Sequence, residues 1–346
     1  MNHFVVAIGR EFGAQGCDIA EKLGVSISTV SKGLNGAADI SEELRQLVLD
    51  TAVEMHYTTK RMRKESNKKL CIFVEHAQHD MPNSFAYDII LGFKQAAYRD
   101  NWDIDIIPIT PEFQTTEKYD TYMLKNGYSG AFLVGFGLQD EWMYQLISTT
   151  FPTVLFDNYI PKNPNIAYVG ADSFEGIDTA IEHLKALHHT RIAFLNGSLY
   201  SMIAEHRERA FYLSMKAHGL PIDNRLIVHT SFYGSGVARD LPALLELGAT
   251  AILCGNDPIA YEVIHECLKA GYRIPEDISV IGFDDLPDSA KTTPPLTTIR
   301  QNRLDLGKCS YSTLCSLLMH VTCSMTLLRP QFVVRESTGE AAASTK

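Results

Sequence analysis

The sequence has no long apolar run. None approaches the roughly 18 residues that a helix needs to cross a bilayer, so we expect no membrane contact. The first residues lack the basic start and the small-residue cleavage site of a signal peptide, which favours a cytoplasmic location. Cys-x-x-Cys spacing is also absent, and the seven cysteines are odd in number and scattered. These absences argue against a disulfide framework or a zinc site, and we expect neither a metal nor a cofactor.

Positive charge is scarce in the chain as a whole. The net charge is −10, which by itself disfavours a nucleic-acid partner. The distribution changes this expectation, because residues 1–69 carry a net charge of +1 and residues 70–346 carry −11. Residues 57–69 hold six lysines and arginines and a single acid, Glu65. Such a segment is suited to gripping a phosphate backbone, although a solvated linker has the same composition.

From about residue 70, short apolar runs alternate with amphipathic segments. The apolar runs predict strands, and they lie at residues 70–74, 104–109, 131–134, 153–156, 166–169, 192–195, 226–228, 251–253, 279–283 and 331–335. The amphipathic segments predict helices at residues 85–99, 141–149, 174–187, 203–218, 237–247, 259–270 and 303–319. Repeated strand–helix units predict parallel sheets with helices on both faces. This stretch is long for one open sheet, so we expect two α/β lobes with a small ligand between them.

The segment DIAEKLGVSISTVSKGLNG at residues 18–36 is the most informative part of the chain. Ala20, Gly24 and Val30 stand where a helix-turn-helix needs a small residue, a turn residue and an aliphatic residue. Ser26 can cap the second helix, whose first turn exposes short polar groups suited to base edges. Ser41 starts a third helix, and its side chains Leu44, Leu47, Val48 and Ala52 are expected to cover the first two helices.

This segment resembles the DNA-binding head of the lactose/galactose repressor family. The resemblance extends through GYRIPEDISVIGFDD at residues 271–285, PPLTTIRQ at 294–301 and LRPQFVVRES at 328–337. It implies an all-α helix-turn-helix head on a two-lobed α/β body like that of periplasmic binding proteins, with strand crossovers near residues 168, 298 and 329. It also implies a homodimer on a near-palindromic operator, acting as a transcription repressor.

The domain boundaries follow from these segments. We expect an atypical N-terminal extension at residues 1–16, the helix-turn-helix domain at 17–57, a basic hinge at 58–69, the body at 70–340 and a tail at 341–346. Lobe 1 of the body is expected at about residues 70–168 and 299–328. Lobe 2 is expected at about residues 169–298 and 329–340.

The resemblance also assigns site residues. The predicted DNA-binding residues are Ser26, Ile27, Ser28, Thr29, Lys32, Asn35 and Met62. The predicted effector-binding residues are Phe85, Asp157, Arg207, Phe232, Asn256, Asp257 and Asp284. Carboxylates accept hydrogen bonds from sugar hydroxyls, an arginine donates in a fixed fork, and the phenylalanines can stack on an apolar sugar face. We therefore expect a small polar effector, a sugar or sugar derivative, although Asn256 and Asp257 equally fit a helix N-cap.

Two features depart from the family pattern. The segment FVVAIGREFGAQG at residues 4–16 resembles the strand and phosphate loop of cytidylate-kinase-like proteins, but no Lys-Ser/Thr follows it. The hinge has Met62 as its single apolar residue between Thr58 and Lys69, where family members carry a leucine that enters the minor groove.

These departures keep a second reading open. It is a cytoplasmic sugar-binding module that does not bind DNA. An enzyme is a third reading, but the sequence offers no nucleophile–base pair, metal cluster or complete phosphate loop, so we expect no enzymatic activity.

Overall fold

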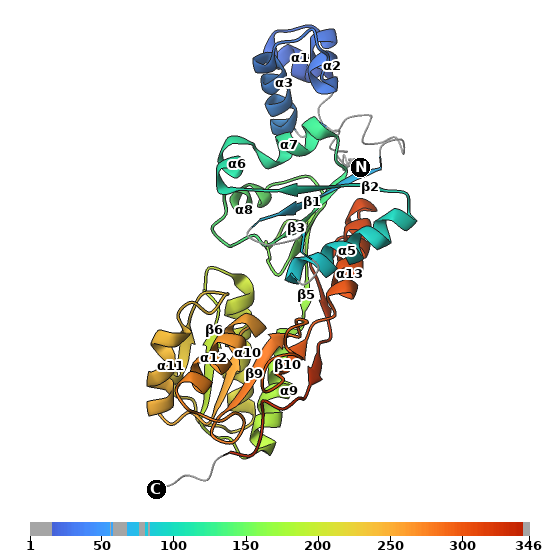
Figure 1. Cartoon of the computed structure of the whole chain (residues 1–346). Coiled ribbons are helices and arrows are strands. Elements are labelled where there is room, and N and C mark those ends of the chain that lie inside the picture. The colour runs from blue at the N-terminus through green and yellow to red at the C-terminus, as the bar shows by residue number, and fades with distance from the viewer. Residues whose placement is uncertain (1–15, 56, 58–67, 76–79, 82–83, 342–346) are drawn as a thin grey trace, which may run out of the picture.

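The computed structural model describes residues 16–55, 57, 68–75, 80–81 and 84–341. Met62 and almost all of the predicted extension and hinge therefore lie outside the described residues. The described chain forms a small helical head followed by two α/β lobes (Figure 1). The head consists of helices α1 (Gly16–Leu23), α2 (Ile27–Asn35) and α3 (Glu42–Glu54).

Lobe 1 is built on a sheet of parallel strands in the order β11-β5-β4-β3-β1-β2. Its strands are β1 (Lys69–Val74), β2 (Asp103–Pro108), β3 (Gly130–Val134), β4 (Thr153–Phe156), β5 (Ile166–Ala171) and β11 (Met325–Leu328). Its helices are α5 (Phe85–Arg99), α6 (Pro111–Thr116), α7 (Tyr119–Asn126), α8 (Glu141–Leu146) and α13 (Arg303–Leu318). The central strands β3 and β4 are buried along their whole length because helices cover both faces of the sheet.

Lobe 2 has a sheet of the same size in the order β12-β10-β9-β8-β6-β7, in which β12 is antiparallel to β10. Its strands are β6 (Ile192–Asn196), β7 (Ile227–His229), β8 (Ala251–Cys254), β9 (Ser279–Asp284), β10 (Thr297–Arg300) and β12 (Gln331–Val333). Its helices are α9 (Ser173–Ala186), α10 (Met202–Ala217), α11 (Val237–Glu246) and α12 (Asp257–Lys269). Apolar clusters lie on the two faces of this sheet.

The chain passes between the lobes three times. It leaves lobe 1 after β5, returns after β10, and crosses again between β11 and β12. These passages lie beside the crossovers predicted near residues 168, 298 and 329. The predicted fold class, a helix-turn-helix head on a two-lobed α/β body with parallel sheets, is confirmed.

Two glycines let helices α5 and α13 touch backbone to backbone. A Cβ on Gly92 would lie 2.0 Å from the carbonyl oxygen of Leu304, and one on Gly307 would lie 1.9 Å from that of Ile89. Neither position has room for any side chain. The two helices are therefore closely packed together, and they cover one face of the lobe 1 sheet (Figure 1).

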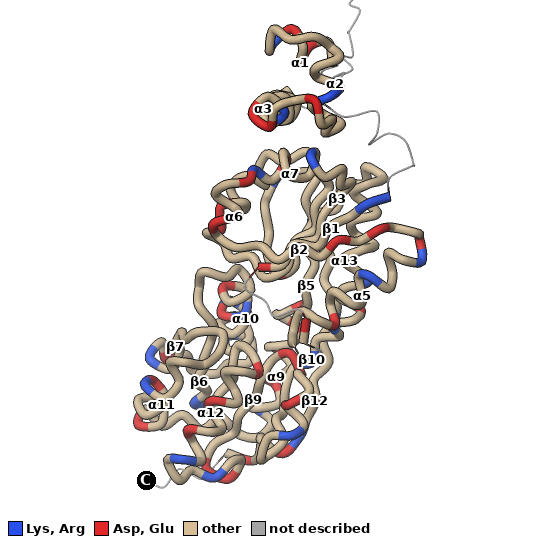
Figure 2. Tube along the Cα trace, turned by 45° about the horizontal axis from the view of Figure 1, so that its top comes forward, with Lys and Arg blue, Asp and Glu red and all other residues tan. Residues whose placement is uncertain are grey.

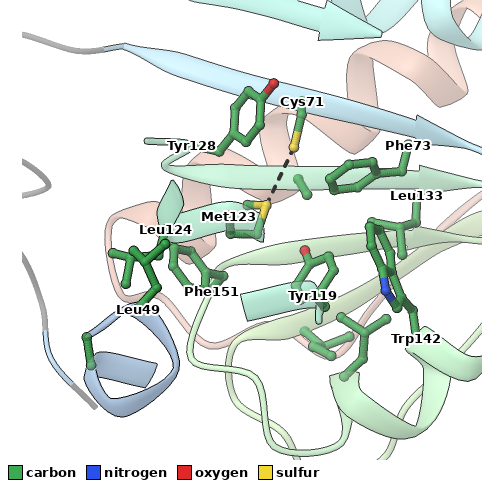
Figure 3. Packing of buried hydrophobic residues seen from close by; sticks show 14 of the residues in the cluster. Leu49, Cys71, Phe73, Tyr119, Met123, Leu124, Tyr128, Leu133, Trp142 and Phe151 are labelled. Carbon is green, nitrogen blue, oxygen red and sulfur yellow. Dashed lines mark hydrogen bonds between the residues drawn. The ribbon is translucent and has the colours of Figure 1, made fainter. Parts of the chain in front are cut away.

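The head rests directly on lobe 1. Leu49 of α3 is fully buried against Leu124 of α7 and Phe151, as Figure 3 shows. Glu42 of α3 accepts a hydrogen bond from Lys125 of α7 at 2.8 Å. Figure 2 shows acidic positions on α3 and basic positions on the neighbouring α7. The predicted role of Leu47 is wrong, since its side chain is 51% exposed and Leu49 takes the buried position.

Two short lobe 1 helices, α6 and α7, and the edge strand β11 were not predicted from the sequence. The helices fall between the predicted strands at 104–109 and 131–134, where the apolar spacing is too short for a clear helical period. No helix among the described residues is long and apolar enough to span a membrane.

Candidate DNA-binding head and effector site

The first two helices of the head have helix-turn-helix geometry. Gly24 ends the first with a φ of +65°, a left-handed conformation that favours glycine. The hydroxyl of Ser26 caps the second by accepting a hydrogen bond from the backbone N–H of Thr29 at 3.1 Å. Ala20 and Val30 are buried between the helices, as their spacing predicts. The turn therefore fixes the angle at which α2 can enter a groove.

Most of the predicted DNA-binding residues lie on the open surface of α2. Ile27 is 61% exposed, although an isoleucine gains free energy from burial, so its position favours a surface that is covered on binding. Ser28 and Asn35 are exposed, while Thr29 is half-buried beside Ser26. Lys32 is exposed and pairs with Asp39 at 2.5 Å. A pair this exposed contributes little stability, so Lys32 can exchange Asp39 for a phosphate.

A group of polar side chains lies between the lobes, of which Arg207, Asp284 and Gln301 are buried and Asp157 is half-buried. We call Asp157, Arg207, Asp284 and Gln301 the effector cluster, after the role predicted from the sequence for the first three. Asp157 follows β4 of lobe 1, Arg207 lies on α10, and Asp284 ends β9. The Arg207 guanidinium stacks on the ring of Phe283 at 3.8 Å and donates to the carbonyl oxygen of Gly255 at 2.5 Å.

The electrostatics of the effector cluster are unusual for aspartates. Burial raises the pKa of Asp284 to about 7, and the nearby Arg207 opposes that rise only in part. Burial likewise raises the pKa of Asp157 to about 7, again opposed by Arg207. Both carboxyls therefore titrate near neutral pH, where a ligand that donates hydrogen bonds would favour their ionised form.

Three buried atoms of the effector cluster have no hydrogen-bond partner among the residues that the structure describes. They are Asp157 Oδ1, Arg207 Nε and Gln301 Oε1. An unpaired buried polar group costs about 1–3 kcal/mol, so such atoms are rare unless a bound molecule satisfies them. Two acceptors and one donor from both lobes thus converge on one region, and their chemistry matches a polyhydroxylated ligand.

The other predicted effector residues, Phe85, Phe232 and Asn256, have different environments in the structure. Phe85, the first residue of α5, packs on Phe156 with ring centroids 5.8 Å apart. Phe232 is half-buried, and its carbonyl oxygen accepts from the side-chain amide of Asn256 at 2.9 Å. The Asn256 side-chain oxygen meanwhile caps α12 through the N–H of Ile259. The Asn256 side chain therefore holds the backbone of Phe232 beside the start of α12.

The prediction for Asp257 needs correction. Its side chain is fully buried inside lobe 2, and both carboxylate oxygens have protein partners. One oxygen accepts from Thr298 at 2.6 Å, and the other accepts from Ser289 at 2.6 Å and from the N–H of Leu286 at 2.8 Å. The position after a strand suggested a ligand contact, but the carboxylate instead ties the 286–289 turn to β10.

Gln301 was not predicted as a site residue, although it is the last residue of the motif PPLTTIRQ at 294–301. Its side-chain amide donates to Asp284 Oδ1 at 2.7 Å, and it is 2% exposed. The available signal was its place just beyond β10, beside the end of β9 in a parallel pair. The ring centroid of Tyr168 on lobe 1 lies 6.5 Å from that of His206 on lobe 2. No group of three metal-binding side chains is found in the part of the chain that the structure describes.

Comparison with known proteins agrees with this architecture. Residues 17–60 match the bacterial regulatory proteins of the lacI family, and residues 181–338 match the periplasmic binding protein-like domain. The repressor PurR of Mannheimia succiniciproducens is 25% identical over 333 residues, covering 94% of this chain and 98% of that protein. The regulator DegA of Bacillus subtilis is 28% identical over 294 residues, covering 84% of this chain and 87% of that protein.

Solved structures give the same result. The lac repressor dimer bound to operator and the anti-inducer ONPF has a TM-score of 0.65 at 25% identity, covering 95% of this chain and 100% of that one. The complex of the transcriptional regulator CelR with cellobiose has a TM-score of 0.70 at 21% identity, covering 94% of this chain and 99% of that one. The chain therefore combines a helix-turn-helix head of the lacI family of bacterial regulatory proteins with a periplasmic binding protein-like body.

Proposed function

We propose that this protein is a sequence-specific transcription repressor whose affinity for its operator is controlled by a small polar effector bound between the two lobes. The observation that carries the effector part is the convergence of Asp157 Oδ1, Arg207 Nε and Gln301 Oε1, which have no partner among the described residues. The exposed face of α2, with Ile27 at its start, supports the DNA part. The protein would act in the cytoplasm, as a homodimer that places two recognition helices about one DNA turn apart.

A carbohydrate is the effector class that fits the cluster best. Carboxylates accept from hydroxyl groups, Arg207 donates, and the amide of Gln301 does both. The ring of Phe232, half-buried near the end of β6, offers an apolar face for a pyranose. A cellobiose complex among the structural neighbours supports this class without naming the sugar for this chain.

The DNA part is tested by selection. The wild-type protein is used to enrich duplexes from a random library, and the enriched duplex is titrated in an electrophoretic shift assay at several salt concentrations. We expect a near-palindromic sequence, with affinity that falls as salt rises because phosphate contacts release counterions. Failure to enrich any sequence would favour the second reading, an effector-binding module without DNA binding, to which the departures at residues 4–16 and in the hinge point.

The effector part is tested by thermal shift. Wild type, Arg207→Ala and Asp284→Asn are screened against a panel of monosaccharides, disaccharides, sugar phosphates and nucleosides. We expect one class to raise the melting temperature of wild type, because a ligand that binds only the folded state stabilises it by mass action. The same compound should leave the melting temperatures of both variants unchanged. A compound that shifts all three proteins equally would place the effector site outside the cluster.

A further inference from the structure

Arg303 makes hydrogen bonds with both lobes, and on lobe 2 it contacts Asp284 of the effector cluster. It is the first residue of α13, directly after the chain returns from lobe 2 to lobe 1. Its Nη1 donates to two backbone carbonyl oxygens of lobe 2, that of Asp284 at 3.2 Å and that of Asp285 at 3.1 Å. Its Nε and Nη2 donate to Oδ2 of Asp88, on α5 of lobe 1, at 3.2 and 3.0 Å. One guanidinium thus holds a carboxylate of one lobe and two carbonyls of the other.

The environment makes these bonds strong. The Arg303 side chain is 11% exposed, so its charge is largely shielded from water. Charge-assisted hydrogen bonds of this kind are stronger than neutral ones, and the rigid fork of arginine sets their direction. Asp88 fixes the fork from the lobe 1 side, because α5 and α13 are in backbone contact at Gly92 and Gly307. Movement of Arg303 relative to lobe 1 is therefore restricted.

The lobe 2 side is equally constrained. Asp284 and Asp285 have φ values of 122° and 52°, which are backbone conformations that residues other than glycine rarely adopt. Side-chain contacts hold them there. Asp285 accepts from Arg300 and from Arg335, each at 2.6 Å, and Asp284 accepts from Gln301. The carbonyls that Arg303 grips consequently move only when this network moves.

We propose that Arg303 is the positioning residue that transmits effector binding from the cluster to the angle between the lobes. This rests on the proposed function, since it assumes that the effector contacts the Asp284 side chain. Asp284 then presents its carboxylate to the effector and its carbonyl to Arg303. A ligand that changes the backbone conformation at Asp284 changes the hydrogen bonds that Arg303 makes with lobe 2. Because Arg303 is also bonded to Asp88, its displacement moves α5 of lobe 1. A ligand shifts a conformational equilibrium only through such state-dependent contacts.

The first test needs no effector. Nitroxide amino acids are incorporated at Tyr144 on lobe 1 and Tyr233 on lobe 2, which are both exposed and remote from Arg303 in sequence. Because the labels are part of these amino acids, no reaction with the native cysteines is involved. Distances between the labels are measured by pulsed electron resonance in four backgrounds: unchanged, Arg303→Met, Asp88→Asn and Arg273→Met. Arg273 is the matched control, because its bidentate pair with Asp277 lies wholly within lobe 2.

We expect Arg303→Met to widen or shift the distribution, because it keeps the apolar stem but removes every donor. Asp88→Asn should change it in the same direction and less, and Arg273→Met should match the unchanged background. If Arg303→Met leaves the distribution unchanged, the proposal is overturned. Should Arg303→Met fail to fold, Arg303→Lys replaces it, since a single ammonium cannot hold Asp88 and both carbonyls in the same geometry.

The second test measures coupling. The probes are the duplex selected by wild type and the compound that gives the largest thermal shift with wild type. We expect the compound to change the operator affinity of wild type roughly 5–150-fold and that of Arg303→Met by less than about twofold, although the variant still binds the compound. Wild-type coupling in Arg303→Met and Arg303→Lys would refute the role of Arg303. Unchanged binding of the compound to Arg207→Ala and Asp284→Asn would instead refute the effector site itself.

Discussion

Arg207 Nη2 lies 3.7 Å from Asp284 Oδ1, close enough for attraction and too far for a hydrogen bond. The side-chain amide of Gln301 donates to the same oxygen of Asp284 at 2.7 Å. Arg207 Nη1 donates instead to the carbonyl oxygen of Gly255. The two charged groups are thus held beside each other by separate partners. This leaves their remaining hydrogen-bonding capacity to a molecule that can contact both.

That arrangement predicts separate effects of mutation on effector and DNA binding. Arg207→Ala and Asp284→Asn should abolish the effector response, because each removes a contact that the ligand makes between the lobes. Their operator affinity without effector should stay within a few-fold of wild type, since α2 is remote from the cluster. Titration of the selected duplex with and without the screened compound measures both quantities. A wild-type response in both variants at the wild-type compound concentration would contradict the prediction.

The raised pKa values predict a dependence of stability on pH. The pKa of Asp284 is about 7 in the folded state and near 4 in the unfolded state, so the folded state holds the proton more tightly. Its contribution to stability is full below about pH 4 and is lost as the pH rises through about 7. Asp284→Asn removes this loss. Relative to wild type, the variant should gain free energy of unfolding between pH 5 and pH 8, on the order of 1–3 kcal/mol.

Urea unfolding at pH 5, 6, 7 and 8 checks the sign. Asp157→Asn should give a parallel trend, because burial also raises the pKa of Asp157 to about 7. Asp277→Asn is the control, since Arg273 lowers the pKa of Asp277 to about 2 and the carboxylate stays ionised over this range. A gap between Asp284→Asn and wild type that does not change with pH would show that Asp284 titrates normally.

The contact between α5 and α13 predicts a large effect from one methyl group. A Cβ on Gly307 would lie 1.9 Å from the Ile89 carbonyl oxygen and 2.7 Å from the Phe93 nitrogen, so the helices must separate. Overpacking of this kind costs about 1–3 kcal/mol or more, and the melting temperature of Gly307→Ala should fall by several degrees. Gly16→Ala adds the same methyl group where, apart from its own helix and chain neighbours, it meets no atom of the described residues within 4 Å, and it should melt as wild type does.

The sequence predicted most of the fold because its signals are local. The caps at Ser26 and Ser41 and the turn at Gly24 each depend on a few neighbouring residues. Site geometry depends on distant segments, which explains the misassignment of Asp257. Its position after β8 fits a ligand contact, but its partners Ser289 and Thr298 are 32 and 41 residues away. Gln301 and Arg303 were missed for the same reason.

The exposed start of α2 predicts distinct effects of two substitutions on DNA binding. Lys32→Ala should weaken binding to all sequences and reduce the salt slope by about 1, as expected for the loss of a phosphate contact. Ser28→Ala should alter the preferred sequence at one position per half-site, because a hydroxyl at a base edge is lost. Selection and salt titration of both variants measure these effects. Wild-type behaviour of both would contradict the assignment of α2 as the recognition helix.

The docking of the head on lobe 1 can be tested with neighbouring leucines of α3. Leu49 is fully buried against Leu124 and Phe151, whereas Leu47 on the same helix is 51% exposed. Leu49→Asp would place a charge in an apolar contact, and burying an unpaired charge has a large free-energy cost. We expect the head to separate from lobe 1 and to melt as its own transition in calorimetry. Leu47→Asp has the same charge and helix propensity and should melt as wild type does.

Operator affinity then reports what docking does for function. A head fixed on lobe 1 is already oriented, so binding costs less conformational entropy than it does for a free head. Leu49→Asp should therefore bind the selected duplex more weakly and should also lose its response to the effector, because a detached head no longer follows lobe 1. Equal affinity and equal effector response in the two aspartate variants would mean that the contact between α3 and α7 has no part in regulation.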